Sequence, residues 1–184
     1  MRGKLMSEHI RLIAQGMNVA PIYWALQSHP ELWNQHTART DDPTSPHYGL
    51  DDIWPRYGDP ERAKDGQPHD AYWYPSADIL GIKPMCLDLM RAVEAVELGG
   101  ILITRIPPGK EVKPHIDPGW HAQRYEKYAI QITSSPGQSF CFEDGQLETK
   151  PGDVYWFDNS FSHWVTNPTP YERVTMIVCV RKGV

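Results

Sequence analysis

Four residues in the second half of the chain could assemble a reactive metal centre. His115 and Asp117 are two positions apart, His163 follows in a later segment, and Arg173 lies ten residues beyond it. Two histidines and a carboxylate on packed β-structure are the ligands of a non-haem Fe(II) site with open coordination positions. An arginine matches a carboxylate through paired hydrogen bonds, so Arg173 could hold the far end of an oxo-acid co-substrate. Together these residues predict an Fe(II)- and 2-oxoglutarate-dependent oxygenase.

The spacings of these residues are not informative one by one. In a chain with this many histidines and aspartates, chance alone gives an expected number of about 0.5 His-x-Asp triplets. The ten-residue spacing also separates His29 from Arg39, in a segment without strand character. Each residue has an ordinary structural interpretation too: core histidines, a turn-forming aspartate and an arginine on an edge strand. The arrangement favours the metal site, because His115 and Asp117 would share one face of a strand and His163 opens a later one.

Composition limits the classes of function. Hydrophobic residues make up 40% of the 184-residue chain and charged residues 22%, which is typical of a soluble globular domain. The net charge of −5 at pH 7 argues against a protein that grips nucleic-acid backbones, because such binding relies on clustered lysines and arginines. The length suits one core, so we expect a single domain over residues 1–184.

The cysteines and the N-terminus indicate the compartment. Cys86, Cys141 and Cys179 are odd in number and have neither disulfide-type nor metal-type spacing, which favours a reducing cytoplasm. No apolar stretch has the length of a signal peptide, and none approaches the roughly 18 residues of a membrane span. We therefore expect a cytoplasmic protein with neither a membrane nor a nucleic acid as partner, while its oligomeric state is left open.

The first half of the chain is predicted to be a flanking region, residues 1–99, made of helices and loops. Apolar spacing predicts helices over residues 21–35 and 84–98, the second ended by Gly99 and Gly100. Residues 39–75 between them are rich in Pro, Asp, His and Gly and are predicted to be mainly loop. Long loops of this kind are often functional. This segment could cover the mouth of the site through His47, Trp54, Arg56 and Tyr57.

The second half, residues 100–184, has the pattern of a β core. Short strand-like segments alternate with turn residues such as Pro, Gly, Asn and Asp. The predicted strands are residues 101–106, 112–116, 128–133, 139–142, 146–149, 153–157, 163–166 and 173–181. This number of short strands in one segment predicts a double-stranded β-helix, the jelly roll of cupin-like proteins, preceded by the helical and loop-rich region. The fold class is therefore mainly β with flanking helices.

The segment from Thr104 to Val180 resembles the aspartyl/asparaginyl β-hydroxylase family of 2-oxoglutarate oxygenases. The matching stretches are Thr104-Arg-Ile-Pro-Pro-Gly-Lys-Glu-Val-Lys-Pro-His115 and Gly152-Asp-Val-Tyr-Trp-Phe-Asp-Asn-Ser-Phe-Ser-His163, continuing to Arg173. In such proteins a Pro-Gly turn precedes the first histidine ligand, and the arginine ten residues after the second anchors the co-substrate. A small hydroxyl residue eleven positions before the first histidine also touches the co-substrate. The resemblance assigns that role to Thr104.

This chain departs from the family pattern in two respects. The animal peptidyl hydroxylases of the family lack the carboxylate ligand, whereas Asp117 would complete the ligand set here. Those enzymes also carry two arginines, two positions apart, that hold an acidic substrate, followed by a histidine near the co-substrate. With a slightly longer loop, Arg124, Glu126 and Tyr128 stand at those places. Glu126 inverts one charge, so the resemblance carries over the co-substrate but not the aspartyl substrate.

The resemblance implies hydroxylation of an amino acid, a peptide side chain or another small substrate, with release of succinate and CO2. Its cofactors would be Fe(II), 2-oxoglutarate as co-substrate, and O2. His115, Asp117 and His163 would hold the metal, leaving three open positions. Arg173 would pair with the 5-carboxylate of 2-oxoglutarate, with Thr104 and Tyr128 as further donors. The candidate substrate contacts are Trp120, His121, Arg124, Glu126 and Trp164, each of which could equally be a packing or solvated residue.

Two other functions are compatible with the same residues. One is a non-catalytic cupin-like protein that binds a metal or a small acid, although it would not need both a carboxylate ligand and Arg173. The other is a Zn-dependent hydrolase that uses the same three ligands, which would be indifferent to 2-oxoglutarate. The sequence contains no His-Glu-x-x-His motif, no phosphate-binding loop and no Ser-His-Asp arrangement that would favour another chemistry.

Overall fold

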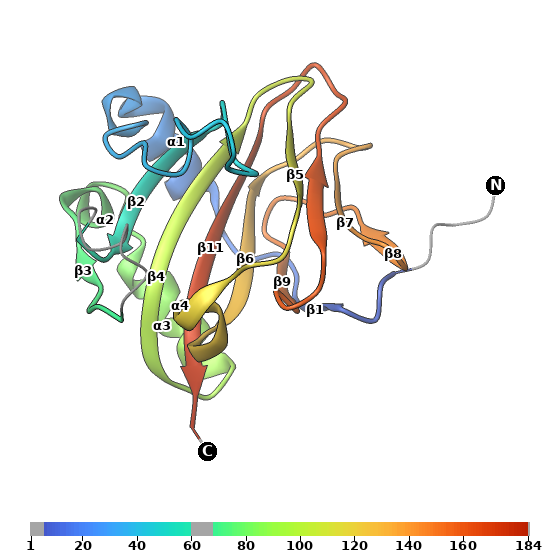
Figure 1. The fold of residues 1–184 in the computed structure, drawn as a ribbon. Helices are drawn as coiled ribbons and strands as arrows, with labels where there is room; N and C mark the ends of the chain where they lie inside the picture. Colours follow the sequence, from blue (N-terminus) through green and yellow to red (C-terminus); the bar gives the residue numbers. More distant parts are fainter. Residues whose placement is uncertain (1–5, 60–67, 184) are drawn as a thin grey trace.

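The strands of the protein form two antiparallel sheets that face each other (Figure 1). The computed structural model describes residues 6–59 and 68–183. Within them, a seven-stranded sheet has the order β1-β9-β6-β11-β4-β2-β3 and a four-stranded sheet the order β5-β10-β7-β8; we call them the large and the small sheet. The strands are β1 (Ile10–Ala14), β2 (Asp51–Tyr57), β3 (Tyr72–Trp73), β4 (Ala95–Ile106), β5 (Glu111–His115), β6 (Glu126–Thr133), β7 (Ser139–Phe142), β8 (Gly145–Leu147), β9 (Val154–Phe157), β10 (His163–Thr166) and β11 (Arg173–Lys182).

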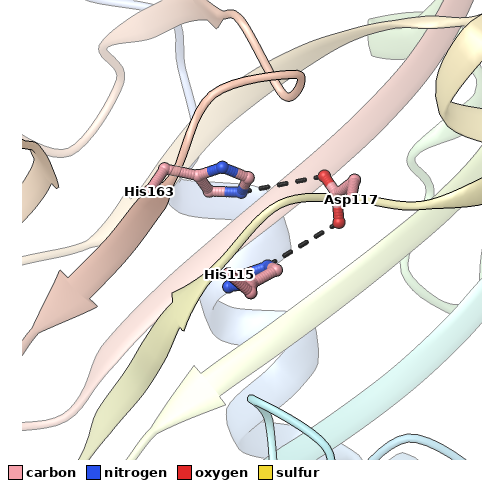
Figure 2. A group of neighbouring side chains, drawn as sticks. All are labelled: His115, Asp117 and His163. Carbon is pink, nitrogen blue, oxygen red and sulfur yellow. Dashed lines mark ion pairs between the residues drawn. The ribbon is translucent and has the colours of Figure 1, made fainter.

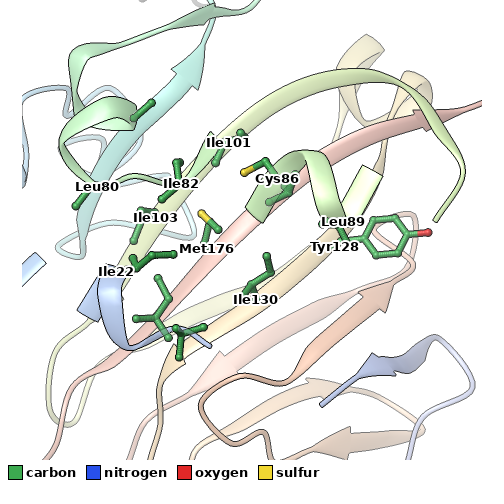
Figure 3. Close-up of a cluster of buried hydrophobic side chains, with 14 of the residues drawn as sticks. Ile22, Leu80, Ile82, Cys86, Leu89, Ile101, Ile103, Tyr128, Ile130 and Met176 are labelled. Atoms are coloured by element: carbon green, nitrogen blue, oxygen red, sulfur yellow. The ribbon is translucent and has the colours of Figure 1, made fainter. Parts of the chain in front are cut away.

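The outer face of the large sheet is covered by helices. These are α1 (Ala20–Ser28), the 3-10 helix η1 (Pro30–Leu32), α2 (Pro75–Ile79) and α3 (Lys83–Ala92), while α4 (Gly119–Arg124) follows β5 near the other face. Figure 3 shows the aliphatic core between α3 and the strands, where Leu89 and Cys86 lie over Met176 and Ile101. These side chains are excluded from water, and their burial is the main source of stability in a domain of this size.

The inner face of the large sheet meets the small sheet through a second, smaller cluster. Phe140, Phe142 and Val165 of the small sheet pack there against Tyr155 and Phe157 of β9. Since successive side chains of a strand point to opposite faces, each long strand contributes to both cores. The prediction of a mainly β, cupin-like jelly roll with flanking helices is confirmed.

The helix boundaries differ from the prediction in two places. The helix predicted over residues 21–35 is divided, because α1 ends at Ser28 and the ring of Pro30 disfavours helical geometry at the residue before it. The helix predicted over residues 84–98 ends at Ala92. Residues 95–98 instead extend β4, where Leu98 pairs with Val180 of β11. Pairing with a long central strand outweighs the local helical pattern there.

The predicted flanking region also contributes strands. β1, β2 and β3 belong to the large sheet, and β2 occupies part of the segment predicted as loop over residues 39–75. Residues 60–67 of that predicted loop lie outside the described residues. In the part of the chain that the structure describes, no helix combines the length and apolar character needed to cross a membrane.

Candidate metal centre

Two strands of the small sheet bring the two histidines together. His115 is the last residue of β5, His163 is the first residue of β10, and the two are direct partners in the antiparallel register. Asp117 follows β5 by two residues, and its backbone N–H donates to the carbonyl of Asn159 at 3.2 Å. One ligand atom from each of the three side chains lies within 4.8 Å of the others, and Figure 2 shows the groups pointing toward one another.

The position of Asp117 corrects the expectation that it shares a strand face with His115. The strand ends at His115, and Asp117 lies in the connection that leads to α4. Its carboxylate oxygens approach both rings: Oδ1 is 3.6 Å from His115 Nε2 and Oδ2 is 3.7 Å from His163 Nε2. The loop, rather than strand alternation, therefore aims this carboxylate.

The outer nitrogens of both rings are fixed by backbone carbonyls. Nδ1 of His115 lies 2.8 Å from the carbonyl of Lys113, and Nδ1 of His163 lies 2.9 Å from that of Phe161. A carbonyl accepts and does not donate, so both Nδ1 atoms carry the proton. Each Nε2 then has a free lone pair directed at the centre, which is how metal-binding histidines are usually held.

The charge states of the three groups also suit a metal ion. Burial lowers the pKa of His163 to about 4 and lowers that of His115, so both rings are neutral near pH 7. Burial opposes ionisation of Asp117, but the ammonium of Lys127 and the two histidines outweigh it, and its pKa is lowered. Metal ions need neutral imidazoles and ionised carboxylates, and these groups have those states before any ion binds.

A cavity of about 270 Å³ opens beside the three groups, between the two sheets. The inner face of the large sheet supplies one wall, including Thr104, Tyr155 and Thr175, and the small sheet supplies Phe140 and Val165. The cavity thus has a polar floor and partly apolar sides, which is the usual character of a small-molecule site.

The region before β4 supplies a further wall through Arg39, His47 and Tyr57. The sequence interpretation placed His47 and Tyr57 over the mouth of the site but missed Arg39. Gly100 makes room for this wall, because a Cβ there would lie 3.0 Å from the ring of Tyr57. Of the other residues proposed to cover the mouth, Trp54 is buried and Arg56 donates to the carbonyls of Ala71 and Leu98. No spacing signal in the sequence connects Arg39 to residues so far along the chain.

Arg173 is not among the residues that line the cavity, but its side chain lies on the same face of β11 as Thr175, which does line it. Arg173 is fully buried, and it has no ion-pair partner among the described residues. Its Nη1 donates to Thr149 Oγ1 at 3.2 Å and its Nη2 to Tyr155 Oη at 3.4 Å, while Nε has no partner. A buried guanidinium with only neutral partners is costly unless an anion joins it.

Thr104 lines the cavity, but its hydroxyl proton is already in use. Its Oγ1 donates to Oδ1 of Asp52 at 2.7 Å, and Asp52 is fully buried. Nη1 of Arg39 lies 3.5 Å from the other oxygen of Asp52. In this structure Thr104 can accept a hydrogen bond from a ligand rather than donate one, which corrects its expected role as a donor to the co-substrate.

Tyr128 does not reach the cavity. Its ring belongs to the aliphatic core on the outer face of the large sheet, and its hydroxyl donates to Glu126 at 2.9 Å. The next residue toward the N-terminus, Lys127, lies on the inner face, lines the cavity and contacts Asp117. The resemblance placed Tyr128 near the co-substrate, but neighbouring residues of a strand face opposite ways, and in this structure it is Lys127 that faces the cavity.

Among the candidate substrate contacts, His121 lines the cavity. Trp120 packs at the outer end of α4, where its ring contacts His69 and Tyr125. Arg124 is tied to Glu97, with Nη2 at 2.8 Å from Oε2. Burial of His121 lowers its pKa to about 4, so this ring is neutral near pH 7.

The other two candidates lie away from the cavity. Glu126 accepts from the hydroxyl of Tyr128 and lies 3.6 Å from Nζ of Lys182. Trp164 follows His163 on β10, so its side chain points to the opposite face of the small sheet. The structure therefore brings one of the five candidates to the site.

The profile of the family described as "Aspartyl/Asparaginyl beta-hydroxylase" matches residues 82–182. In fold, the chain is similar to the viral collagen prolyl hydroxylase of Paramecium Bursaria Chlorella virus-1 in complex with 2OG, with a TM-score of 0.59 and 9% identity over 97% of this chain and 98% of that one. A Pseudomonas putida prolyl-4-hydroxylase gives a TM-score of 0.54 and 13% identity over 96% and 94% of the two chains.

A Burkholderia pseudomallei oxidoreductase of the 2OG-Fe(II) oxygenase family is also similar, with a TM-score of 0.56 and 10% identity over 74% of this chain and 70% of that one. No curated protein matches the sequence. At sequence identities of 9–13%, similarity to these structures establishes only the fold. The assignment to a family rests on the matched profile.

The matched family profile defines the class of the protein: it is a 2-oxoglutarate-dependent hydroxylase. The matched segment spans more than half of the chain and contains His115, Asp117, His163 and Arg173. The chain belongs to the aspartyl/asparaginyl β-hydroxylase family, whose cofactors are Fe(II), 2-oxoglutarate and O2.

Proposed function

We propose that His115, Asp117 and His163 bind Fe(II), and that the protein hydroxylates an amino acid, a peptide side chain or another small substrate with release of succinate and CO2. The observation that supports this most strongly is the convergence of the three ligand atoms within 4.8 Å beside a cavity. When bound, Fe(II) supplies the activation of O2, and the protein supplies orientation and exclusion of water. Two neutral histidines and one ionised carboxylate fit this ion.

We also propose that Arg173 binds the 5-carboxylate of 2-oxoglutarate. The support is its full burial without a counter-ion among the described residues, together with its unpartnered Nε. A guanidinium has donors left for a carboxylate after it has donated to Thr149 and Tyr155. The anion would compensate a charge that otherwise lowers stability.

In this proposal Tyr155 takes the role that the sequence assigned to Tyr128. Its hydroxyl accepts from Arg173, lines the cavity and keeps its own proton available for the same carboxylate. Arg39 and Lys127 also line the cavity, but the carboxylates of Asp52 and Asp117 offset their charges. Arg173, which has no counter-ion among the described residues, is therefore the cation that favours an anionic ligand such as 2-oxoglutarate.

The cavity walls would shield the reacting C–H bond from water. Ile177, Phe157 and Val165 offer apolar surface, while His121 and Tyr57 lie at the side formed by α4 and β2. A group of the substrate would have to enter this space for its C–H bond to approach the ion. The volume of about 270 Å³ lies just below the roughly 300–1,000 Å³ that is typical of small-molecule sites, which favours a small reacting group.

The proposed function is tested by loading the protein with Fe(II) and 2-oxoglutarate without oxygen and then admitting O2. We expect succinate to form only when both are present, and to form faster with a true substrate from a panel of amino acids and peptides. No succinate with any substrate, and none by uncoupled turnover, would contradict the oxygenase assignment. Activity that needs Zn(II) and ignores 2-oxoglutarate would favour the hydrolase instead.

A further inference from the structure

Lys127 lies directly beside the candidate metal ligands. In the register of the large sheet it pairs with Phe157 of β9 and Cys179 of β11, and its side chain lines the cavity. Its Nζ contacts Oδ2 of Asp117, and both side chains are largely buried, at 16% and 17% exposure. An ammonium group is only a donor, so Lys127 occupies a lone pair of that oxygen.

The two oxygens of Asp117 therefore have different surroundings. Each oxygen faces one histidine, with Oδ1 3.6 Å from His115 Nε2 and Oδ2 3.7 Å from His163 Nε2, but Oδ2 is the one that also accepts from Lys127. This difference matters because a carboxylate can bind a metal through one oxygen or through both. If a bound ion had six coordination positions, three single-atom protein ligands would leave three of them for 2-oxoglutarate and O2. A carboxylate that used both oxygens would remove the position for O2.

We propose that Lys127 is a positioning residue that holds Oδ2 of Asp117, so that the carboxylate offers the metal ion one oxygen and a coordination position is kept for O2. The inference rests on the proposed function, since it needs an ion at the three ligands. Partners of metal-binding carboxylates typically change metal affinity or activity by about 10–100-fold when they are removed.

The ammonium could instead be a stand-in that occupies the place of the ion and leaves when the ion binds. The two roles predict opposite results. A stand-in competes with the metal, so its removal would tighten Fe(II) binding and leave the open positions unchanged. Removal of a positioning residue would instead weaken ligand binding at the open coordination position, while Fe(II) would still bind.

The test measures binding of nitric oxide, a stable analogue of O2, to the anaerobic complex of the protein with Fe(II) and 2-oxoglutarate. The variants are Lys127→Met, which removes the donor, and Lys127→Arg, which keeps one. Lys182→Met is the matched control, because it removes a lysine that is paired with Glu126 away from the cavity. The electron paramagnetic resonance signal of the iron–nitrosyl complex reports nitric oxide binding, and a separate titration reports Fe(II) affinity.

For Lys127→Met we expect Fe(II) affinity within about threefold of wild type and nitric oxide affinity at least about tenfold lower. Lys127→Arg should restore nitric oxide binding, and Lys182→Met should resemble wild type. Unchanged nitric oxide binding with tighter Fe(II) binding would overturn the inference in favour of the stand-in. Loss of Fe(II) binding in a folded Lys127→Met protein would overturn it as well, because the lysine would then be needed for the ion itself. Failure of the wild-type protein to bind Fe(II) would be a different result, since it would contradict the proposed function.

Discussion

The two faces of the large sheet serve different purposes, and β11 shows the contrast within one strand. On the outer face, Met176 and its neighbours of the same parity pack against the helices and are almost fully buried among aliphatic side chains. On the inner face, Arg173 and Thr175 are also buried but are polar; Thr175 lines the cavity, and Arg173 contacts Tyr155, which lines it. One strand therefore carries a core and the floor of a site on alternate residues.

The difference shows where stability is gained and where it is given up. The outer face excludes water from a continuous aliphatic cluster, which stabilises the fold. Among the described residues, the inner face buries the guanidinium of Arg173 without a counter-ion. Such a group costs stability in the ligand-free protein, and an anionic ligand would offset that cost. Inner-face variants should thus alter binding and outer-face variants stability.

The largest effect is expected for His163→Ala on the inner side. Loss of a ligand should reduce Fe(II) affinity and succinate formation by more than about 100-fold, because removing even an indirect partner costs about 10–100-fold. Metal titration and a succinate assay measure the two quantities, with His29→Ala as an exposed control that is paired with Glu31. Iron-dependent succinate formation at the wild-type rate by the folded His163→Ala protein would contradict the role of His163 as a metal ligand.

Met176→Ala tests the outer face. The side chain is fully buried in the aliphatic cluster, so its truncation should lower the free energy of unfolding by about 2–5 kcal/mol. Urea denaturation measures the loss, and 2-oxoglutarate affinity should stay unchanged. A loss below about 1 kcal/mol, or a clear change in 2-oxoglutarate affinity, would show that the two faces are not independent.

Arg173→Met exchanges the buried cation for an apolar side chain. We expect 2-oxoglutarate to bind about 10–100-fold more weakly, because a charged hydrogen-bonding group contributes about 1.5–3 kcal/mol. The free energy of unfolding should stay equal or rise, since an uncompensated buried charge is removed. Anaerobic titration and urea denaturation give the two values, with Arg181→Met as control for an arginine paired with Glu97. Strong destabilisation with unchanged co-substrate affinity would make Arg173 a structural residue.

The smallest effects distinguish two tyrosine hydroxyls. Tyr128→Phe should lose about 1 kcal/mol or less of stability with its bond to Glu126 and leave 2-oxoglutarate affinity unchanged. Tyr155→Phe should weaken 2-oxoglutarate binding by roughly 3–10-fold, since its hydroxyl lies between Arg173 and the cavity. The same titration measures both variants. Weaker 2-oxoglutarate binding by Tyr128→Phe, with none of this loss in Tyr155→Phe, would contradict the assignment of Tyr155 to the co-substrate.

The fold was predictable where local pattern and tertiary structure agree. The predicted strands over residues 139–142 and 163–166 coincide with β7 and β10, because turn residues bound both segments. β1 and β2 were missed, since their partners β9 and β4 lie far along the chain, and the two-residue β3 pairs only with β2. β2 lies within a segment rich in Pro and Asp and is held by register with Ile103 and Thr104 of β4. Local propensity carries no information about such partners.

The sequence by itself determined the chemistry of the centre: His115, Asp117, His163 and Arg173 are the residue types that this chemistry needs, in segments with a β pattern. The tertiary structure decided which side chains meet them. It placed Lys127 rather than Tyr128 on the cavity wall, and it brought Arg39 from the N-terminal region to the same cavity. The physical reason is that successive side chains of a strand point to opposite faces of the sheet. An error of one residue in the alignment therefore assigns a core residue to the site, or a site residue to the core. Contacts between segments far apart in the chain depend on sheet register, which no local pattern specifies.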